Sequence, residues 1–335
     1  MSALGAVILG AAGPRLTDEE KALYRAVRPF GFILFARNIE SPDQVRALCD
    51  EMRAAAGHDA IITIDQEGGR VQRLRAPVWR DWPAPLEQAA AAGADASVAM
   101  YLRYRLIAAE LAALGIDSNC APVADVAGPD THPFLRDRCY GFTAGHVALL
   151  ARGVADGLRD GGVLPVLKHI PGHGRAAADS HHDLPRVTTT ARTLAETDFA
   201  AFEALADLPM AMTAHVVYTA IDDRPATLSP GVIAHIRDSI GFDGLLMTDD
   251  ISMKALSGDL AGLTGDALAA GCDVVLHCNG HLEEARAVAE AAGAMSAPAQ
   301  ARADRALAAR QAPDGADTAT LTAQLDALTG GPVHG

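Results

Sequence analysis

Short apolar segments recur along the chain and alternate with longer segments whose apolar residues have helical spacing. Eight of the short segments are apolar on both faces and are bounded by Gly, Pro or Asp, as buried parallel strands are. They lie at residues 6–9, 32–35, 60–64, 116–119, 163–167, 210–213, 244–247 and 273–277. This pattern predicts eight strands of one parallel sheet.

Helices are predicted between these strands. Ser41 is a typical N-cap residue and Pro42 suits the first helical position, which predicts a helix that ends near Ala56. The helix predicted over 96–114 is followed by Gly115, a typical C-terminal stop. The same apolar spacing predicts further helices at 143–158, 194–205, 230–240, 262–270 and 282–292.

The alternation of strands and helices predicts an α/β protein, a single (β/α)8 TIM barrel with a C-terminal helical extension. In the 335-residue chain we expect one domain (1–335), with the barrel over about 5–295 and the helical tail over about 297–330. A doubly wound sheet is the competing arrangement, but the glycines at 10–13 lack the spacing of a dinucleotide-binding fingerprint. No Walker A sequence occurs either.

The charge and composition exclude several classes of partner. The formal net charge is −14 and Lys and Arg are not clustered, so neither nucleic acid nor an anionic membrane is expected as a partner. No apolar run reaches the ~18 residues of a membrane span. The five cysteines form no Cys-x-x-Cys pair and no basic segment precedes the first apolar run, so we expect free thiols and a cytoplasmic protein. The sequence does not set the oligomeric state, and a monomer is the default expectation.

Polar side chains gather where the predicted strands end. They follow five of the eight strands, at the carboxyl ends where TIM-barrel enzymes carry their active sites. These residues include Asp65, Arg73, Asp125, Arg138, Lys168, His169, His215 and Asp249. They titrate or bind hydroxyl groups, and a purely structural barrel would not need this concentration of them. The pattern therefore predicts an enzyme.

The richest segment is 168–182, which holds four histidines, one lysine and one aspartate in fifteen residues. Its glycines and proline predict a loop. Asp179 and His181 are two residues apart, so the carboxylate can hydrogen-bond the imidazole, raise its pKa and fix its tautomer. Such a pair suits general acid/base catalysis near neutral pH. The alternative is a solvated loop whose histidines cap turns.

Two other chemistries could use the same segment. His169, His173, Asp179 and His181 could bind zinc, but Pro and Gly interrupt the segment and its spacing matches no helical zinc motif. Lys168 could form a Schiff base at the end of its strand. A charged lysine that hydrogen-bonds a substrate hydroxyl is the favoured interpretation, and neither a metal nor a cofactor is expected.

Two carboxylates, Asp249 and Asp250, end the predicted strand 244–247 and its continuation. Side chains of neighbouring strand residues point to opposite faces, so only one of the two can face a given centre. Asp250 suits the N-cap of a helix expected over 251–256. Asp249 is then the free carboxylate.

Three segments together resemble glycoside hydrolase family 3: 65–73 (DQEGGRVQR), 168–174 (KHIPGHG) with 179–181 (DSH), and 248–253 (TDDISM). They are similar to the corresponding segments of bacterial cytosolic β-N-acetylglucosaminidases of peptidoglycan recycling. The likeness covers about residues 5–276. It implies a retaining exo-enzyme that removes terminal β-linked N-acetylglucosamine from muropeptides and needs no cofactor.

The resemblance also implies residue roles. Asp249 would be the nucleophile, and His181, supported by Asp179, would be the acid/base. The residues that match sugar-binding positions of the family are Asp65, Arg73, Arg138, Lys168 and His169.

The departures from the family pattern are small. Ile170 stands where phenylalanine is common, Thr248 stands where serine is common, and His182 matches no family role. Alternatives to a hexosaminidase are another family 3 glycosidase such as a β-glucosidase, a zinc-dependent hydrolase, and a carbohydrate-binding barrel without catalysis. The loop formed by 172–174 (GHG) and 179–181 (DSH) favours the hexosaminidase over the β-glucosidase, because the resemblance associates that loop with hexosaminidases.

Overall fold

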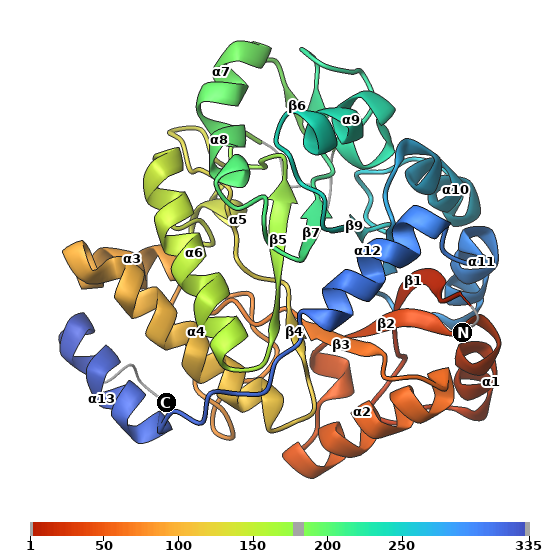
Figure 1. Cartoon of the computed structure of the whole chain (residues 1–335), viewed down its shortest axis with the longest axis horizontal. Coiled ribbons are helices and arrows are strands. Elements are labelled where there is room, and N and C mark those ends of the chain that lie inside the picture. The colour runs from red at the N-terminus through yellow and green to blue at the C-terminus, as the bar shows by residue number, and fades with distance from the viewer. Residues whose placement is uncertain (1–2, 177–183, 332–335) are drawn as a thin grey trace.

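The computed structural model describes residues 3–176 and 184–331. Eight parallel strands form its main sheet, in the order β3-β2-β1-β10-β9-β7-β5-β4 (Figure 1). Their bounds are β1 Gly5–Gly10, β2 Pro29–Leu34, β3 Ile61–Ile64, β4 Ser118–Asn119, β5 Leu164–Ile170, β7 Met210–Thr213, β9 Leu245–Asp250 and β10 Val274–His277. Each overlaps a predicted strand, so the eight-stranded parallel sheet is confirmed.

The sheet is nearly closed into a barrel. Its two end strands, β3 and β4, are not paired in the ladder, but two backbone hydrogen bonds cross between them. The Asp117 N–H donates to the Ile62 carbonyl at 3.1 Å, and the Cys120 N–H donates to the Ile64 carbonyl at 2.9 Å. The TIM-barrel prediction is therefore confirmed, and the doubly wound alternative is wrong.

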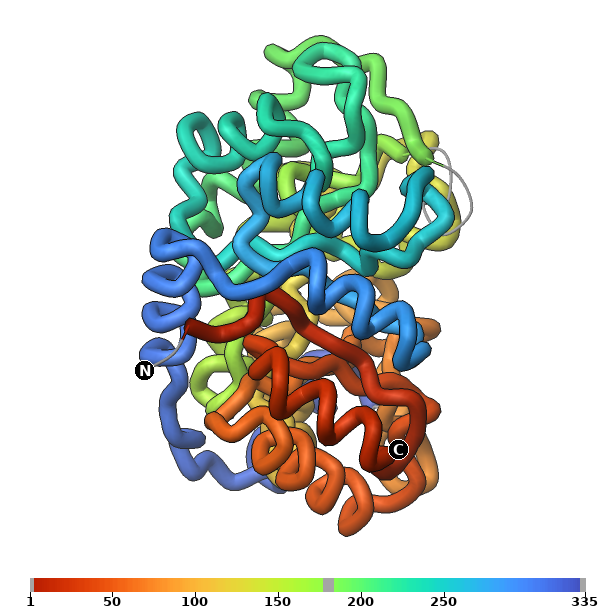
Figure 2. Tube along the Cα trace, turned by 90° about the vertical axis from the view of Figure 1, so that its right-hand side faces the viewer, coloured from red at the N-terminus to blue at the C-terminus, as the bar shows by residue number. Residues whose placement is uncertain are grey.

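Helices surround the barrel (Figures 1 and 2). Their bounds are α1 Asp18–Val27, α2 Pro42–Ala56, α3 Pro85–Ala92, α4 Ala96–Ala112, α5 Pro133–Arg136, α6 Ala144–Asp160, α7 Ala191–Glu196, α8 Asp198–Glu203, α9 Pro230–Asp238, α10 Leu260–Ala270, α11 Leu282–Ala292, α12 Ala297–Ala308 and α13 Thr318–Thr329. Short 3-10 turns lie at η1 Ala36–Asn38, η2 Gly93–Asp95 and η3 Ala226–Leu228, and a second small sheet pairs β6 Arg186–Val187 with β8 Val217–Tyr218. Among the described residues, no helix has the length and apolar character to span a membrane.

Three local predictions need correction. The helix predicted at 194–205 is two helices, α7 and α8, because Thr197 between them has non-helical dihedrals (φ −123°, ψ −76°). Helices α1, α3 and α5 were not predicted, although Thr17 and Glu20 form a capping box at the start of α1. The helix expected over 251–256 is absent from this described segment, which forms turns instead.

The first and last described segments are tied to the rest of the barrel. Figure 2 shows the first described residues beside α12, where the Leu4 N–H donates to Gln300 Oε1 at 2.9 Å. The predicted tail is confirmed as two helices. Arg302 of α12 pairs with Asp273 at 3.1 Å, and Thr322 of α13 accepts a hydrogen bond from Arg80 at 2.8 Å.

Helices α4 and α6 pack against one another at close range on the outside of the barrel (Figure 1). Gly157 of α6 permits this approach, because a Cβ at this position would lie 2.4 Å from the Tyr101 carbonyl oxygen. Any larger residue would push the two helices apart. The close packing matters for the site, because α4 carries Arg103 and Tyr104, whose side chains donate hydrogen bonds to the Glu67 carbonyl in the loop after β3.

Asp117 helps to join β3 and β4, the two strands at which the barrel closes. This contact generates a prediction for stability. Its carboxylate accepts a hydrogen bond from the Ile62 N–H at 2.7 Å and pairs with Arg310 at 2.9 Å. We expect Asp117→Ala to lower the free energy of unfolding by about 1–3 kcal/mol, because it leaves partly buried partners unsatisfied. Urea denaturation measures this change in the free energy of unfolding.

The control is Asp223→Ala, which removes an exposed ion pair with Arg186 and should change stability by less than about 0.5 kcal/mol. Equal effects of the two substitutions would contradict the role of Asp117 in joining β3 to β4.

Candidate active site

A pocket of about 330 Å³ opens at the carboxyl ends of the barrel strands. Six of the predicted site residues line it: Asp65, Arg73, Arg138, Lys168, His169 and Asp249. They come from the segments that follow β3 and β4 and from the ends of β5 and β9. The predicted acid/base pair, Asp179 and His181, lies outside the described residues, as does His182.

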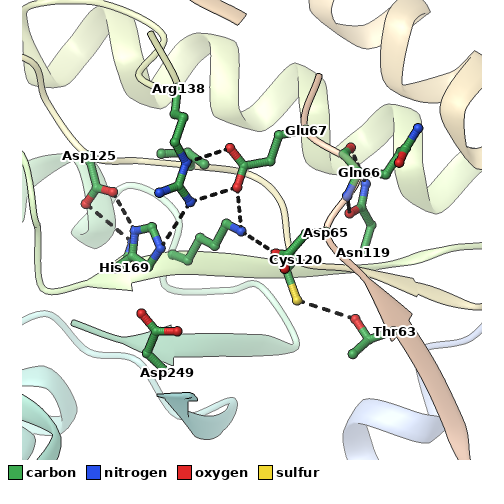
Figure 3. Close-up of polar contacts among 12 residues, drawn as sticks. Thr63, Asp65, Gln66, Glu67, Asn119, Cys120, Asp125, Arg138, His169 and Asp249 are labelled. Atoms are coloured by element: carbon green, nitrogen blue, oxygen red, sulfur yellow. Dashed lines mark hydrogen bonds and ion pairs between the residues drawn. The ribbon is translucent and has the colours of Figure 1, made fainter. Parts of the chain in front are cut away.

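Asp65 lies between two cations at the end of β3. Its Oδ1 is 2.9 Å from Lys168 Nζ (dashed line at Asp65 in Figure 3), and its Oδ2 is 2.9 Å from an Arg73 guanidinium nitrogen. Burial raises the pKa of Asp65, but Lys168 and Arg73 lower it by more, so the pKa lies well below the usual range. The carboxylate is ionised at neutral pH and can accept hydrogen bonds from hydroxyl groups.

Glu67 is a member of the site to which the sequence analysis gave no role. It is fully buried, and its carboxylate holds Arg138 with two hydrogen bonds, at 2.9 and 2.8 Å (Figure 3). Its Oε1 also lies 2.6 Å from Lys168 Nζ. Glu67 is two residues after Asp65, a spacing that directs both side chains to one face of an extended segment. That spacing was the sequence feature from which Glu67 could have been predicted as part of the site.

The two carboxylates control the charge of Lys168. Burial lowers the pKa of Lys168, but Asp65 and Glu67 raise it by more, and the net pKa is above its ordinary value. For Glu67 itself, burial raises the pKa, but Arg138 and Lys168 lower it by more. A Schiff-base lysine must react as the neutral amine. The charged state of Lys168 therefore argues against that alternative.

A β-bulge directs Lys168 and His169 into the same pocket. In the pairing with β7, Lys168 lies opposite Met212 and Ile170 lies opposite Thr213, so His169 is an extra residue on β5. A bulge of this kind re-aims one side chain relative to the regular alternation of a strand. The peptide bond between Lys168 and His169 is cis.

Asp125, in the segment after β4, orients His169. Its Oδ2 is 2.7 Å from His169 Nδ1 (Figure 3), and its Oδ1 accepts a hydrogen bond from the His173 N–H at 2.6 Å. An ionised carboxylate only accepts, so Nδ1 of His169 carries a proton. Nε2 lies 3.4 Å from Arg138. Burial raises the pKa of Asp125, but His169 lowers it by more, which keeps the carboxylate ionised.

His173 also lines the pocket, and its electrostatic environment differs from that of the sugar-binding candidates. Burial, together with the neighbouring His169, lowers the pKa of His173 to about 4. The imidazole is therefore uncharged at neutral pH. His173 therefore adds an uncharged ring to the pocket lining, which also contains the charged side chains of Asp65, Arg138 and Lys168.

Gln66 fixes the backbone around Arg73. Its side-chain oxygen accepts hydrogen bonds from the N–H groups of Arg73 and Leu74, at 2.8 and 3.1 Å. Its side-chain nitrogen donates to the Leu74 carbonyl at 2.9 Å. These bonds close the loop after β3 and hold Arg73 beside Asp65.

Aromatic rings also line the pocket, and the sequence analysis did not predict them as part of the site. The guanidinium of Arg73 lies 5.0 Å from the centre of the Phe35 ring. That of Arg138 lies 5.5 Å from the centre of the Phe134 ring. Cations at such distances from a ring gain cation–π stabilisation, which limits their motion.

Asp249 lies at the end of β9, across the pocket from the cation-rich wall (Figure 3). Its Oδ1 accepts a hydrogen bond from the Asp250 N–H at 2.8 Å. Burial raises the pKa of Asp249, but His215 and His169 lower it by more, so the net pKa is below its ordinary value. The side chain is thus an ionised carboxylate that faces a pocket lined by hydrogen-bond donors.

Asp250 is used structurally. Its Oδ1 accepts hydrogen bonds from the Ser252 N–H at 3.1 Å and from the Cys278 N–H at 3.2 Å. The residue caps a turn, and the helix for which it was predicted as the N-cap does not form. The bonds to Ser252 and Cys278 explain this, because they tie the turn to the end of β10.

The zinc alternative involved four side chains, of which Asp179 and His181 lie outside the described residues. Within 3–176 and 184–331, no three His, Cys, Asp or Glu side chains gather as a potential metal site.

Comparison with known proteins adds independent information. Residues 8–308 match the glycosyl hydrolase family 3 N-terminal domain. A β-hexosaminidase from Alkalilimnicola ehrlichii is 42% identical, over 85% of this chain and 83% of that protein. A β-hexosaminidase from Methylococcus capsulatus is also 42% identical, over 80% of each. NagZ from Neisseria gonorrhoeae, solved with N-trifluoroacetyl-D-glucosamine, is 29% identical with a TM-score of 0.85, and the match covers 98% of this chain and 96% of that one.

The ion network of Glu67 generates a prediction about stability and its pH dependence. We expect Glu67→Gln to lower the free energy of unfolding at neutral pH by about 3 kcal/mol, because Lys168 and Arg138 lose a buried counter-charge. The folded-state pKa of Glu67 is lowered, so its contribution is complete above the unfolded pKa of about 4.3 and is lost as the pH falls below it. Urea denaturation at several pH values measures both effects.

The matched control for this prediction is Glu196→Gln, which removes an exposed ion pair with Arg192. We expect it to change stability by less than about 0.5 kcal/mol. The wild-type protein should lose more stability than Glu67→Gln between neutral pH and about pH 3.5. Parallel pH curves for these two proteins would contradict the assignment.

Proposed function

The chain belongs to glycosyl hydrolase family 3, and from this premise we propose that it is a retaining exo-β-N-acetylglucosaminidase that acts through a covalent glycosyl-enzyme. The chain is a glycoside hydrolase with β-N-acetylhexosaminidase activity.

The observation that carries the proposal is the position of Asp249. It is an ionised carboxylate at a strand end, and it faces Lys168 and His169 across a pocket of about 330 Å³. A pocket near the lower end of the usual range for ligand sites suits a single sugar ring. In this arrangement Asp65 accepts from ring hydroxyls, and Lys168, Arg138 and Arg73 donate to hydroxyls and to the acetamido carbonyl.

The proposed reaction has two steps. In the first, an Asp249 oxygen forms a bond to the anomeric carbon, the bond from that carbon to the leaving oxygen breaks, and His181 gives its proton to the leaving oxygen. In the second, water attacks the anomeric carbon and gives its proton to His181, and the bond to Asp249 breaks. The configuration at the anomeric carbon is retained, because it is inverted twice.

His181 in the acid role departs from the usual pair of carboxyl groups in retaining glycosidases. An isolated histidine has a pKa near ~6.5 and would be largely neutral at cytoplasmic pH. The proposal assigns Asp179 to stabilise the imidazolium and raise that pKa.

The proposed natural substrate is a peptidoglycan-derived muropeptide with a terminal, non-reducing, β-linked N-acetylglucosamine, hydrolysed in the cytoplasm. Support comes from the motifs at 65–73, 168–174 with 179–181, and 248–253, and from the similarity to NagZ of Neisseria gonorrhoeae. The second candidate is a family 3 glycosidase that prefers plain glucosides.

The first test separates these candidates and examines the nucleophile. Wild-type protein should hydrolyse 4-nitrophenyl N-acetyl-β-glucosaminide with a kcat/KM at least about 100-fold above that for the β-glucoside, because buried donors to the acetamido group are left unpaired by glucose. Asp249→Asn should lower kcat by at least about a thousandfold, since a neutral amide cannot form the covalent intermediate.

The control for this test is Asp266→Asn, which changes an exposed carboxyl group on α10 and should leave kcat unchanged. Equal turnover by wild-type protein and Asp249→Asn would remove the nucleophile assignment. A preference for the glucoside would favour the second candidate.

The acid/base pair makes a prediction about the pH–rate profile. If the Asp179 carboxylate raises the pKa of His181, Asp179→Asn should lower that pKa. The alkaline limb of kcat/KM, which reports loss of the proton from the acid, should then move to lower pH, and kcat at neutral pH should fall by about 10²–10⁴. His182→Gln, which changes a neighbour without an assigned role, should retain the wild-type profile. An unchanged profile in Asp179→Asn would contradict the pair.

A further inference from the structure

His215 is a buried histidine that the reaction described above does not use. It lies in the segment after β7, and its side chain is fully shielded from solvent. Its Nε2 is 2.9 Å from the carbonyl oxygen of Asp250, the residue that follows Asp249. Its Nδ1 is 2.7 Å from the hydroxyl oxygen of Thr227.

The partners of His215 define what the ring does. A carbonyl oxygen only accepts hydrogen bonds, so Nε2 must carry a proton and donate it to Asp250. The Thr227 hydroxyl holds the opposite side of the ring, and Thr227 Oγ1 is itself 2.8 Å from Thr213 Oγ1 at the end of β7. Two side chains therefore fix the plane of the imidazole, and its Nε2–H points at the backbone of β9.

His215 contacts β9 beyond the point where the backbone pairing between β7 and β9 ends. The pairing of β7 with β9 ends at Met212 opposite Met247, three residues before Asp250. On the other side of β9, the Ile251 N–H donates to the Leu276 carbonyl at 2.9 Å. The end of β9 is thus held from β10 by backbone bonds, and from the β7 side by the His215 side chain.

The backbone of Asp250 connects His215 to the nucleophile. Its carbonyl accepts the bond from His215, and its N–H donates to Asp249 Oδ1 at 2.8 Å. The two groups belong to the peptide planes on either side of the Asp250 Cα, so a displacement of this residue would disturb both bonds. The position of one carboxylate oxygen of Asp249 therefore depends on the anchoring of the Asp250 carbonyl.

We propose that His215 is a positioning residue for the reaction: its Nε2–H anchors the Asp250 carbonyl and thereby orients the Asp249 carboxylate toward the anomeric carbon. The inference rests on the proposed role of Asp249 as nucleophile. The electrostatics agree with it, because burial raises the pKa of Asp249 and His215 is the neighbour that lowers it most.

The experiment compares two substitutions at one position. In His215→Gln, the amide keeps an N–H for the Asp250 carbonyl and an oxygen that can accept from Thr227. In His215→Phe, the ring volume is nearly kept and both polar atoms are lost. The rate of aryl release from 4-nitrophenyl N-acetyl-β-glucosaminide in a single turnover reports the attack of Asp249, and the inhibition constant of N-acetylglucosamine reports binding.

We expect His215→Phe to lower the single-turnover rate at least about tenfold, which corresponds to about 1.4 kcal/mol of transition-state stabilisation. The inhibition constant should change less than about twofold, because the groups that bind the sugar are untouched. His215→Gln should restore most of the rate. If His215→Phe does not fold, Thr227→Val loosens the ring without removing it and should lower the rate with the same unchanged binding.

The matched control is His58→Phe. His58 Nε2 also bonds a backbone carbonyl, that of Pro29, at 2.9 Å, but at the opposite end of β2 from the pocket. It should leave the single-turnover rate unchanged. A wild-type rate in folded His215→Phe, or a failure of His215→Gln to restore the rate, would overturn the inference. Absence of any hydrolysis by wild-type protein would instead contradict the proposed function itself.

Discussion

The site depends on one buried ion network at the carboxyl end of the barrel. Asp65 and Glu67 supply two negative charges, and Lys168 and Arg138 supply two positive charges, all within hydrogen-bond distance of a partner. Isolated charges at these depths would cost several kcal/mol each, whereas a network in which every member has a partner can be retained. The network keeps the cations charged and stationary, so that their remaining donors are available to a neutral, hydroxyl-rich ligand.

The barrel brings this network together from distant parts of the chain. Glu67 and Arg138 are 71 residues apart in sequence and meet because β3 and β4 close the barrel. The opposite wall has a different construction. Asp249 stands at the end of β9, and that strand end is held by backbone bonds to β10 and by the side chain of His215. The wall that contains the ion network therefore offers charged groups to a ligand. The opposite wall presents the Asp249 carboxylate in a fixed direction.

Much of the fold follows from the sequence, because buried parallel strands have a strong signature. Each of the eight predicted strands is found, and so is the helical tail. The break at Thr197 was missed because apolar spacing continues across it, and the turn after Asp250 was mistaken for a helix because its stabilising partner, Cys278, is remote in sequence. A local sequence pattern gives no information about contacts with residues that are remote in sequence.

The same limit applies to the site. The motifs identified side chains that can act on a ligand, and six of them line one pocket. They did not identify Glu67, Asp125 or His215 as supporting residues, because each acts through a partner at least twelve residues away. The β-bulge that turns His169 into the pocket likewise depends on the register with β7.

Asp249 is proposed as the nucleophile that forms the covalent glycosyl-enzyme, and trapping that intermediate is the most direct test of this role. The protein would be incubated with an N-acetylglucosaminyl fluoride that carries a second fluorine at C5, which slows both steps, and then digested and analysed by mass spectrometry. The account predicts a stoichiometric sugar ester on the peptide that contains Asp249. Turnover of the reagent with an adduct on a different residue, or release of an inverted product without any adduct, would contradict it.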